Sequence, residues 1–236
     1  MIEILTYAWH IFSNEIKYIT LLAVPFTLLA FPSYFISQPT EDKIALPTII
    51  GLIIYLIGFS MYLSTLIFFM SQKYRNKLEP VKSNIINGLV YAPLLMITLV
   101  IANSPIIAAC IIIFSSMSLQ FIALPLFILG IYISLKTTFA PFHLILEGYK
   151  PLAAIRCSFY STNGKVVKII LVSILFYFFS SLVESLTNFK TRIEPFNVLI
   201  FFIGVAVTML MVAIQQIAVF KLYINSFEQI AKEIID

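Results

Sequence analysis

A run of 53 residues, 83–135, contains no charged side chain. A helix crosses the hydrocarbon of a bilayer with about 20 mostly apolar residues, so this run is long enough for two crossings and a turn. Hydrophobic residues make up 61% of the 236-residue chain and charged residues 11%, whereas a soluble domain has about 45–50% and about 25%. The composition excludes a disordered, collagen-like or disulfide-stapled chain and predicts that lipid surrounds most of the protein.

Charges divide the rest of the sequence into further apolar stretches. Because every backbone polar group in lipid needs an internal partner, these stretches predict helices. We therefore expect an all-α, polytopic membrane protein with six transmembrane helices in a single integral domain, 1–236. The predicted spans lie near 18–37, 47–70, 93–115, 119–142, 166–187 and 197–220. The turn in the uncharged run is placed at 115–118, with Pro105 as a kink inside a helix; a turn at 103–105 is the alternative.

Two further segments have the pattern of short amphipathic helices on the membrane surface. In 1–17, apolar residues recur at helical spacing, at Leu5, Trp9, Phe12 and Ile16. In 151–163, Pro151 suits the first turn of a helix, the stripe Leu152, Ile155 and Phe159 is apolar, and Gly164 is a natural stop. Packing of both segments on the helix bundle is the alternative.

Lys and Arg residues orient the predicted spans, because cytoplasmic loops of membrane proteins are enriched in these residues. With the N-terminus inside, only Lys43, Lys190 and Arg192 fall outside. The other twelve fall on the cytoplasmic side: Lys17, Lys73, Arg75, Lys77, Lys82, Lys136, Lys150, Arg156, Lys165, Lys168, Lys221 and Lys232. The counts predict a multi-pass protein with both termini in the cytoplasm.

One region of the sequence resembles a known family. Gly130-Ile-Tyr-Ile-Ser-Leu-Lys136 leads into Phe139-Ala140-Pro141-Phe142, and Ala154-Ile155-Arg156-Cys157-Ser158 follows. These segments resemble the enterobacterial YciC-type family of uncharacterised inner-membrane proteins, in which a Pro-Gly hairpin, an Ala-Pro helix end and an Ala-x-Arg-x-Ser helix are typical. Pro125 departs from the pattern, since it stands five residues before Gly130. The resemblance implies a six-span protein of the bacterial inner membrane and implies no established activity, so no catalytic residue is carried over.

Residues for catalysis or metal binding are scarce. The chain has two aspartates, Asp42 in a predicted outer loop and Asp236 at the end, so a paired-aspartate or aspartate-rich metal site cannot form. His10 and His143 lack the spacing of a zinc motif. We therefore expect no enzyme, no cofactor and no metal; a serine–histidine dyad that uses His143 is the remaining alternative. The basic residues cluster at the ends of apolar runs, which favours a membrane surface over nucleic acid as partner.

Ionisable and amide side chains at membrane depth are the candidates for a functional site, because a charge there is costly. They are Glu184, Lys136, Gln120, Gln215 and Gln216. Each has a structural alternative: Glu184 can reach the outer interface, Lys136 can extend its stem to the inner interface, and the amides can join helices.

The function that the sequence favours is that of a structural or accessory protein of the bacterial envelope. Its predicted partners are the lipid bilayer, other membrane proteins or a second copy of the chain. Lys73, Arg75, Lys77 and Lys82 are predicted to contact anionic phospholipid headgroups, at about 1 kcal/mol each. The alternative is a small-molecule permease or channel that uses Glu184 and the membrane amides.

Overall fold

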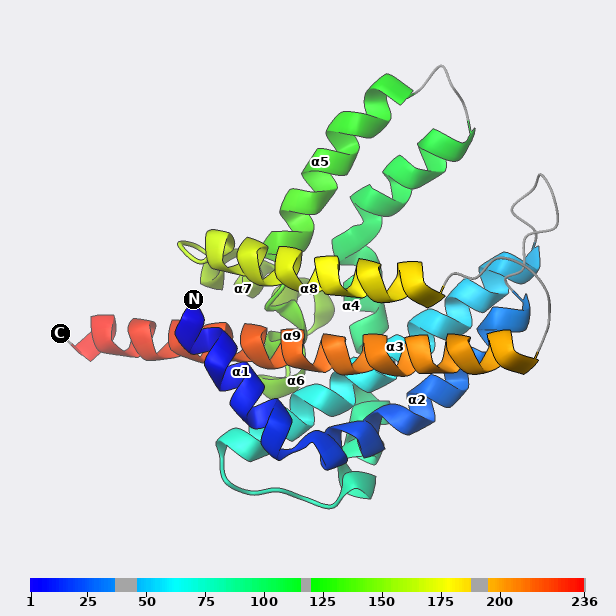
Figure 1. The fold of residues 1–236 in the computed structure, drawn as a ribbon. Coiled ribbons are helices and arrows are strands. Elements are labelled where there is room, and N and C mark those ends of the chain that lie inside the picture. Colours follow the sequence, from blue (N-terminus) through cyan, green and yellow to red (C-terminus); the bar gives the residue numbers. More distant parts are fainter. Residues whose placement is uncertain (37–45, 116–119, 188–194, 236) are drawn as a thin grey trace. The chain divides into compact units, whose positions relative to one another are not determined.

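The computed structural model describes residues 1–36, 46–115, 120–187 and 195–235, and these form nine α-helices (Figure 1). The helices are α1 (Ile2–Asn14), α2 (Ile16–Ile36), α3 (Leu46–Tyr74), α4 (Val81–Ser115), α5 (Gln120–Lys136), α6 (Ala140–Leu146), α7 (Pro151–Ser161), α8 (Val166–Thr187) and α9 (Pro195–Ile235). The expected all-helical class is confirmed for this part of the chain.

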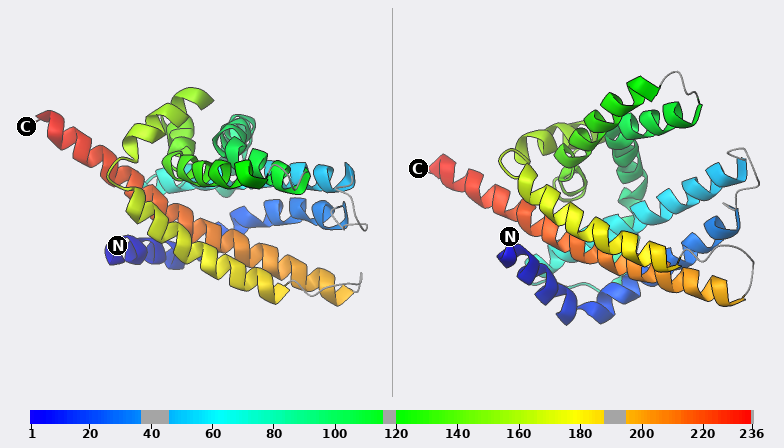
Figure 2. Two further views of the ribbon diagram at one scale, coloured as in Figure 1. Left: turned by 90° about the horizontal axis from the view of Figure 1, so that it is seen from above. Right: turned by 45° about the horizontal axis from the view of Figure 1, so that its top comes forward.

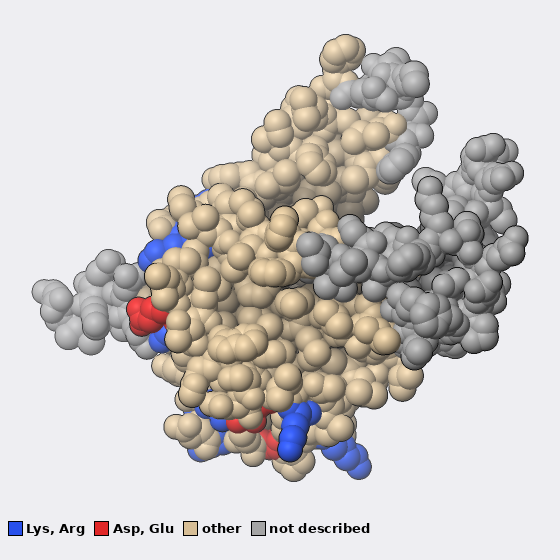
Figure 3. Space-filling view, in the orientation of Figure 1, with Lys and Arg blue, Asp and Glu red and all other residues tan. Residues whose placement is uncertain are grey.

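Four helical stretches among the described residues are long and apolar enough to cross a membrane: Ile53–Tyr74, Val81–Ile113, Phe121–Leu146 and Ile203–Ser226. A fifth results if α7 and α8, which meet at a bend of 107°, are counted as one broken span. On the face drawn in Figure 3, charged side chains are sparse over the described surface. The helices therefore suit a membrane protein, and the total of six spans stays a prediction.

Two local predictions, the turn at 115–118 and the apolar stripe of residues 1–17, can be compared with α4 and α1. α4 continues through Pro105 to Ser115, the first residue of the turn predicted at 115–118, and residues 116–119 lie outside the described part of the chain. α1 buries Ile4, Ala8 and Phe12, whereas Trp9 of the predicted apolar stripe is 61% exposed. Of the stripe predicted for α1, Phe12 is thus buried in the protein, whereas Trp9 is exposed.

The chain divides into two compact units, which are described separately. Unit 1 comprises Met1–Pro93 and Leu171–Lys221, and unit 2 comprises Leu94–Ile170 and Leu222–Asp236. In unit 1, α2 packs along α3, as the views in Figures 1 and 2 agree. The hydroxyl of the fully buried Tyr62 on α3 donates to the carbonyl of Met209 on α9 at 2.8 Å, which ties these two helices at their apolar contact.

A close crossing between α3 and α4 depends on Gly88. A Cβ atom at this position would lie 2.2 Å from Thr65 Oγ1 and 2.8 Å from the Thr65 backbone nitrogen. The approach lets Ser64 Oγ donate to the carbonyl of Gly88 at 2.8 Å. Small residues at helix contacts in membrane proteins permit this kind of backbone approach and the hydrogen bonds that accompany it.

The corresponding crossing in unit 2 lies between α4 and α5. A Cβ atom on Gly130 would lie 2.5 Å from Ile106 Cγ1 and 2.8 Å from the Ile106 backbone nitrogen. This contact leaves the opposite side of α5 exposed, including Phe121 and Ile128. α5 is therefore held by one narrow face, and its other side chains are available for other contacts.

We expect Gly88→Ala to lower the free energy of unfolding in detergent by about 1–3 kcal/mol, because backbone atoms of Thr65 occupy the space that the new methyl group needs. Gly58→Ala is the matched control, since a Cβ there would lie 3.6 Å from Leu29 Cβ, an ordinary contact. Thermal unfolding of both purified variants measures the difference. Equal midpoints for the two variants would show that the α3–α4 crossing tolerates a larger residue.

Candidate functional site

The site begins where the apolar helix α5 ends. α5 stops at Lys136, and α6 starts at Ala140, with Pro141 in its first turn. Proline has no backbone N–H and its ring clashes with the preceding turn, so a continuous helix through 137–141 is unfavourable. The span predicted at 119–142 is therefore divided into two helices, and the break frees backbone polar groups that need other partners.

Ser158 of α7 supplies these partners. Its hydroxyl donates to the carbonyl of Lys136 at 2.7 Å and accepts the backbone N–H of Phe139 at 3.0 Å. Thr162, one turn later, adds a longer bond from Oγ1 to the same Lys136 carbonyl, at 3.3 Å. Ser158 and Thr162 are fully buried. The small and polar side of α7 thus rests against the helix break, which fixes α7 beside the end of α5.

This arrangement buries most of Lys136. Only 8% of the residue is exposed, and Nζ donates to Asn163 Oδ1 at 2.5 Å. The end of α7 covers the Lys136 side chain. Gly164, which follows Asn163, has a φ of +73° and allows the chain to turn directly into α8.

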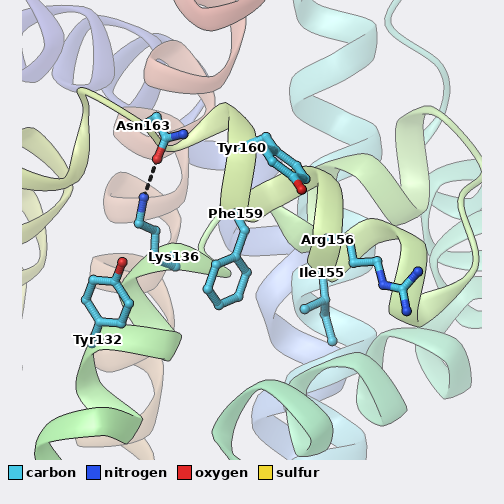
Figure 4. Close-up of a pocket in the computed structure, with 7 residues that line it drawn as sticks. All are labelled: Tyr132, Lys136, Ile155, Arg156, Phe159, Tyr160 and Asn163. Atoms are coloured by element: carbon cyan, nitrogen blue, oxygen red, sulfur yellow. Dashed lines mark hydrogen bonds between the residues drawn. The ribbon is translucent and has the colours of Figure 1, made fainter.

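Lys136 lies at one end of a pocket of about 430 Å³ between α5 and α7 (Figure 4). Tyr132 directs its hydroxyl to the same end, Phe159 lies in the middle, and the guanidinium of Arg156 points away from Lys136 at the other end. The lining residues are Tyr132, Lys136, Ile155, Arg156, Phe159, Tyr160 and Asn163. The predicted stripe of α7 thus lines a pocket through Ile155 and Phe159, while Ala154 and Ser158 form the buried side.

The pocket has two cationic residues, Lys136 and Arg156, and none of its seven lining residues is acidic. The ion pairs found among the described residues, Lys73–Glu15 and His143–Glu147, leave both cations without a carboxylate partner. Outside the pocket, in the α7–α8 turn, desolvation lowers the pKa of the Lys165 ammonium, and repulsion from Lys168 lowers it further. An anion is the ligand that this surrounding favours.

A second polar cluster in unit 2 surrounds His143 of α6. Its Nε2 lies 3.0 Å from Ser161 Oγ of α7, and its Nδ1 lies 3.1 Å from Glu147 Oε2. Tyr223 of α9 donates to Glu147 Oε1 at 2.6 Å. The structure thus brings His143 beside a serine, as the dyad alternative requires. His143 is 3% exposed and Ser161 does not line the described pocket, so these contacts join α6, α7 and α9.

The other predicted site residues have different surroundings. Gln215 and Gln216 are half-buried on α9 in unit 1, and the side chains of Gln120 and Glu184 lie outside the described part of the structure. Of the predicted headgroup contacts, Arg75, Lys77 and Lys82 are exposed, whereas Lys73 forms an ion pair with Glu15. Of the five predicted polar membrane residues, Lys136 is the one that lines the described pocket.

Sequence reasoning missed Asn163 and Tyr132 as pocket residues and Ser158 as the residue that positions α7. Spacing carried part of the signal, because Tyr132 lies one helical turn before Lys136. Asn163 and Ser158 come from a segment 22–27 residues later, and no local pattern indicates that contact.

The chain was compared with protein-family models, with curated proteins and with solved structures, and none of them matches. The described residues include no group of three or more His, Cys, Asp or Glu side chains that could hold a metal ion. The chemistry of the site therefore follows from the pocket's own residues.

We expect Ser158→Ala to lower the free energy of unfolding by about 1–3 kcal/mol, because the Lys136 carbonyl and the Phe139 N–H lose a buried partner. Ser13→Ala is the control, since the Ser13 hydroxyl is exposed and bonds only within its own helix, to the His10 carbonyl. Thermal unfolding in detergent reports the difference. A Ser158→Ala midpoint as high as that of Ser13→Ala would contradict this role for Ser158.

Proposed function

We propose that this chain is a multi-pass protein of a bacterial inner membrane with a structural or accessory role, and that its Lys136 pocket binds a phosphate-bearing anion. The observation that carries the proposal is the burial of Lys136 with a neutral amide as its hydrogen-bond partner. Burying an ammonium group without a counter-charge is costly. A bound anion offsets that cost and explains why the charge is present.

The attraction that such a ligand would gain is considerable. Two unit charges 4 Å apart interact by about 4 kcal/mol at the effective dielectric constant of a site near a protein surface. Around the Lys136 end of the pocket, the Tyr132 hydroxyl and the Asn163 amide add neutral hydrogen-bonding groups. Lysine commonly binds phosphate as a point charge. Hydroxyl and amide groups can donate hydrogen bonds to the phosphate oxygens that the lysine does not contact.

The place of the pocket along the chain supports a ligand at the membrane surface. Lys136 is the last residue of α5, and Asn163 precedes the first residue of α8, Val166, by three positions. In the predicted topology, both positions lie at the cytoplasmic side. The exposed residues Arg75, Lys77 and Lys82 are assigned to the same side, where they favour contact with anionic headgroups.

The soluble anion sn-glycerol 3-phosphate tests the pocket without lipid. We expect it to raise the thermal unfolding midpoint of the purified chain, since a ligand at about 100 times its dissociation constant stabilises a protein by about 2.7 kcal/mol. Lys136→Gln removes the charge and should abolish the rise, while Lys136→Arg should retain part of it.

Lys168→Gln is the matched control, because Lys168 is exposed and is not a lining residue of the pocket. This variant should keep the full rise in midpoint. An equal rise in Lys136→Gln and Lys168→Gln would show that the anion acts elsewhere, and the proposed function would then be wrong.

The orientation can be tested by cysteine labelling in intact cells and inverted vesicles. In a chain with Cys110 and Cys157 replaced by serine, we expect Lys77→Cys to react with a membrane-impermeant maleimide only from the cytoplasmic side. Lys43→Cys should react only from the outside, because the excess of Lys and Arg places its loop there. The opposite labelling pattern would contradict the topology.

A further inference from the structure

One side of α5 carries exposed apolar residues directly up to the pocket. At 3.6 residues per turn, Ile128, Leu129, Tyr132 and Lys136 lie on one side of the helix. Ile128 is 60% exposed, Leu129 49% and Tyr132 50%. Because the buried Gly130 turns the other side of α5 toward Ile106 of α4, this apolar side is left open along the helix.

α7 extends the apolar surface at the pocket itself. Ile155 and Phe159 line the pocket between the Lys136 end and the Arg156 end. Leu152, one helical turn earlier on the same stripe, is also exposed. Apolar side chains of both α5 and α7 therefore lie next to the cationic residues of the pocket.

We propose that the occupant of the pocket is an anionic glycerophospholipid whose phosphate lies at Lys136 and whose acyl chain follows Leu129 and Ile128 along α5. This inference rests on the proposed function and names its ligand. A free phosphate satisfies Lys136 but leaves the exposed side of α5 without a partner. A lipid satisfies both, because its charge and its chain are joined at the boundary where α5 ends.

The charge of the pocket selects among lipids. Its lining residues include two cations and no acid, so a lipid with net negative charge is attracted more strongly than a zwitterionic one, whose ammonium group meets positive charge. Phosphatidylglycerol is therefore the expected class of ligand, and phosphatidylcholine with the same chains is the weaker competitor.

Native mass spectrometry of the full chain in detergent can count bound lipids across a titration. We expect phosphatidylglycerol to bind more tightly than phosphatidylcholine of equal chain length, and Lys136→Gln to weaken phosphatidylglycerol binding about tenfold or more, as for a lost hydrogen bond to a charged group. Lys136→Arg, which keeps the charge, should retain most of the affinity.

The acyl-chain path is tested by two matched double variants. Ile128→Ala with Leu129→Ala should weaken phosphatidylglycerol binding severalfold and leave the stabilisation by sn-glycerol 3-phosphate unchanged. Phe127→Ala with Ile131→Ala removes two exposed apolar side chains that lie, on average, about 130° further around α5 and should leave both readings unchanged.

Each outcome decides one part of the proposal. Equal affinities of the two double variants for phosphatidylglycerol would overturn the acyl-chain path along α5. If both variants were still stabilised by sn-glycerol 3-phosphate, the proposed function would remain. Equal binding of phosphatidylcholine and phosphatidylglycerol would also overturn the choice of an anionic lipid. If Lys136→Gln bound both phosphatidylglycerol and sn-glycerol 3-phosphate as well as the unmodified chain does, the inference and the proposed function would both be overturned.

Discussion

Backbone groups that leave a helix in an apolar surrounding must find partners within the protein, since lipid offers none. The break between α5 and α6 meets this requirement through Ser158, which bonds the carbonyl of Lys136 and the N–H of Phe139. This pair of bonds requires α7 to lie against the end of α5. The position of α7 then covers Lys136, brings Asn163 to its ammonium group and forms the pocket.

The packing of α7 shows how one short helix serves two surfaces. Its small residues, Ala154 and Ser158, are buried, so α7 approaches the helix break closely. Its larger residues, Ile155 and Phe159, lie on the side that lines the pocket. A similar division operates in α5, where Gly130 allows the close crossing with α4 while the bulky side chains of the opposite side stay exposed. Small residues thus decide the contacts, and large residues become available for a ligand.

The sequence predicts the helices well because the bounds of a helix depend on neighbouring residues, namely on the length of an uncharged run and on the positions of proline and glycine in it. The continuous α4 through Pro105 and the turn at Gly164 are examples of features that the chain's own pattern indicates. Periodicity predicts an apolar stripe on α7, but it does not tell whether such a face contacts lipid, the protein core or a ligand. The burial of Lys136 is not predictable in this way, because it depends on Asn163, a residue 27 positions later. Contacts of that range come from the fold and carry no local signal.

Within the described parts of the chain, the buried Lys136 forms no ion pair with a carboxylate. From Tyr132 to Lys168 inclusive, the sequence has five Lys and Arg residues and a single acidic residue, Glu147. Glu147 accepts the Tyr223 hydroxyl and lies against His143, so its carboxylate is already engaged. If Lys136 served stability alone, an apolar residue of similar volume would serve better, because a buried charge adds a desolvation cost. A ligand with its own negative charge would remove this cost, and in the proposed lipid the acyl chain would in addition cover the exposed apolar side of α5.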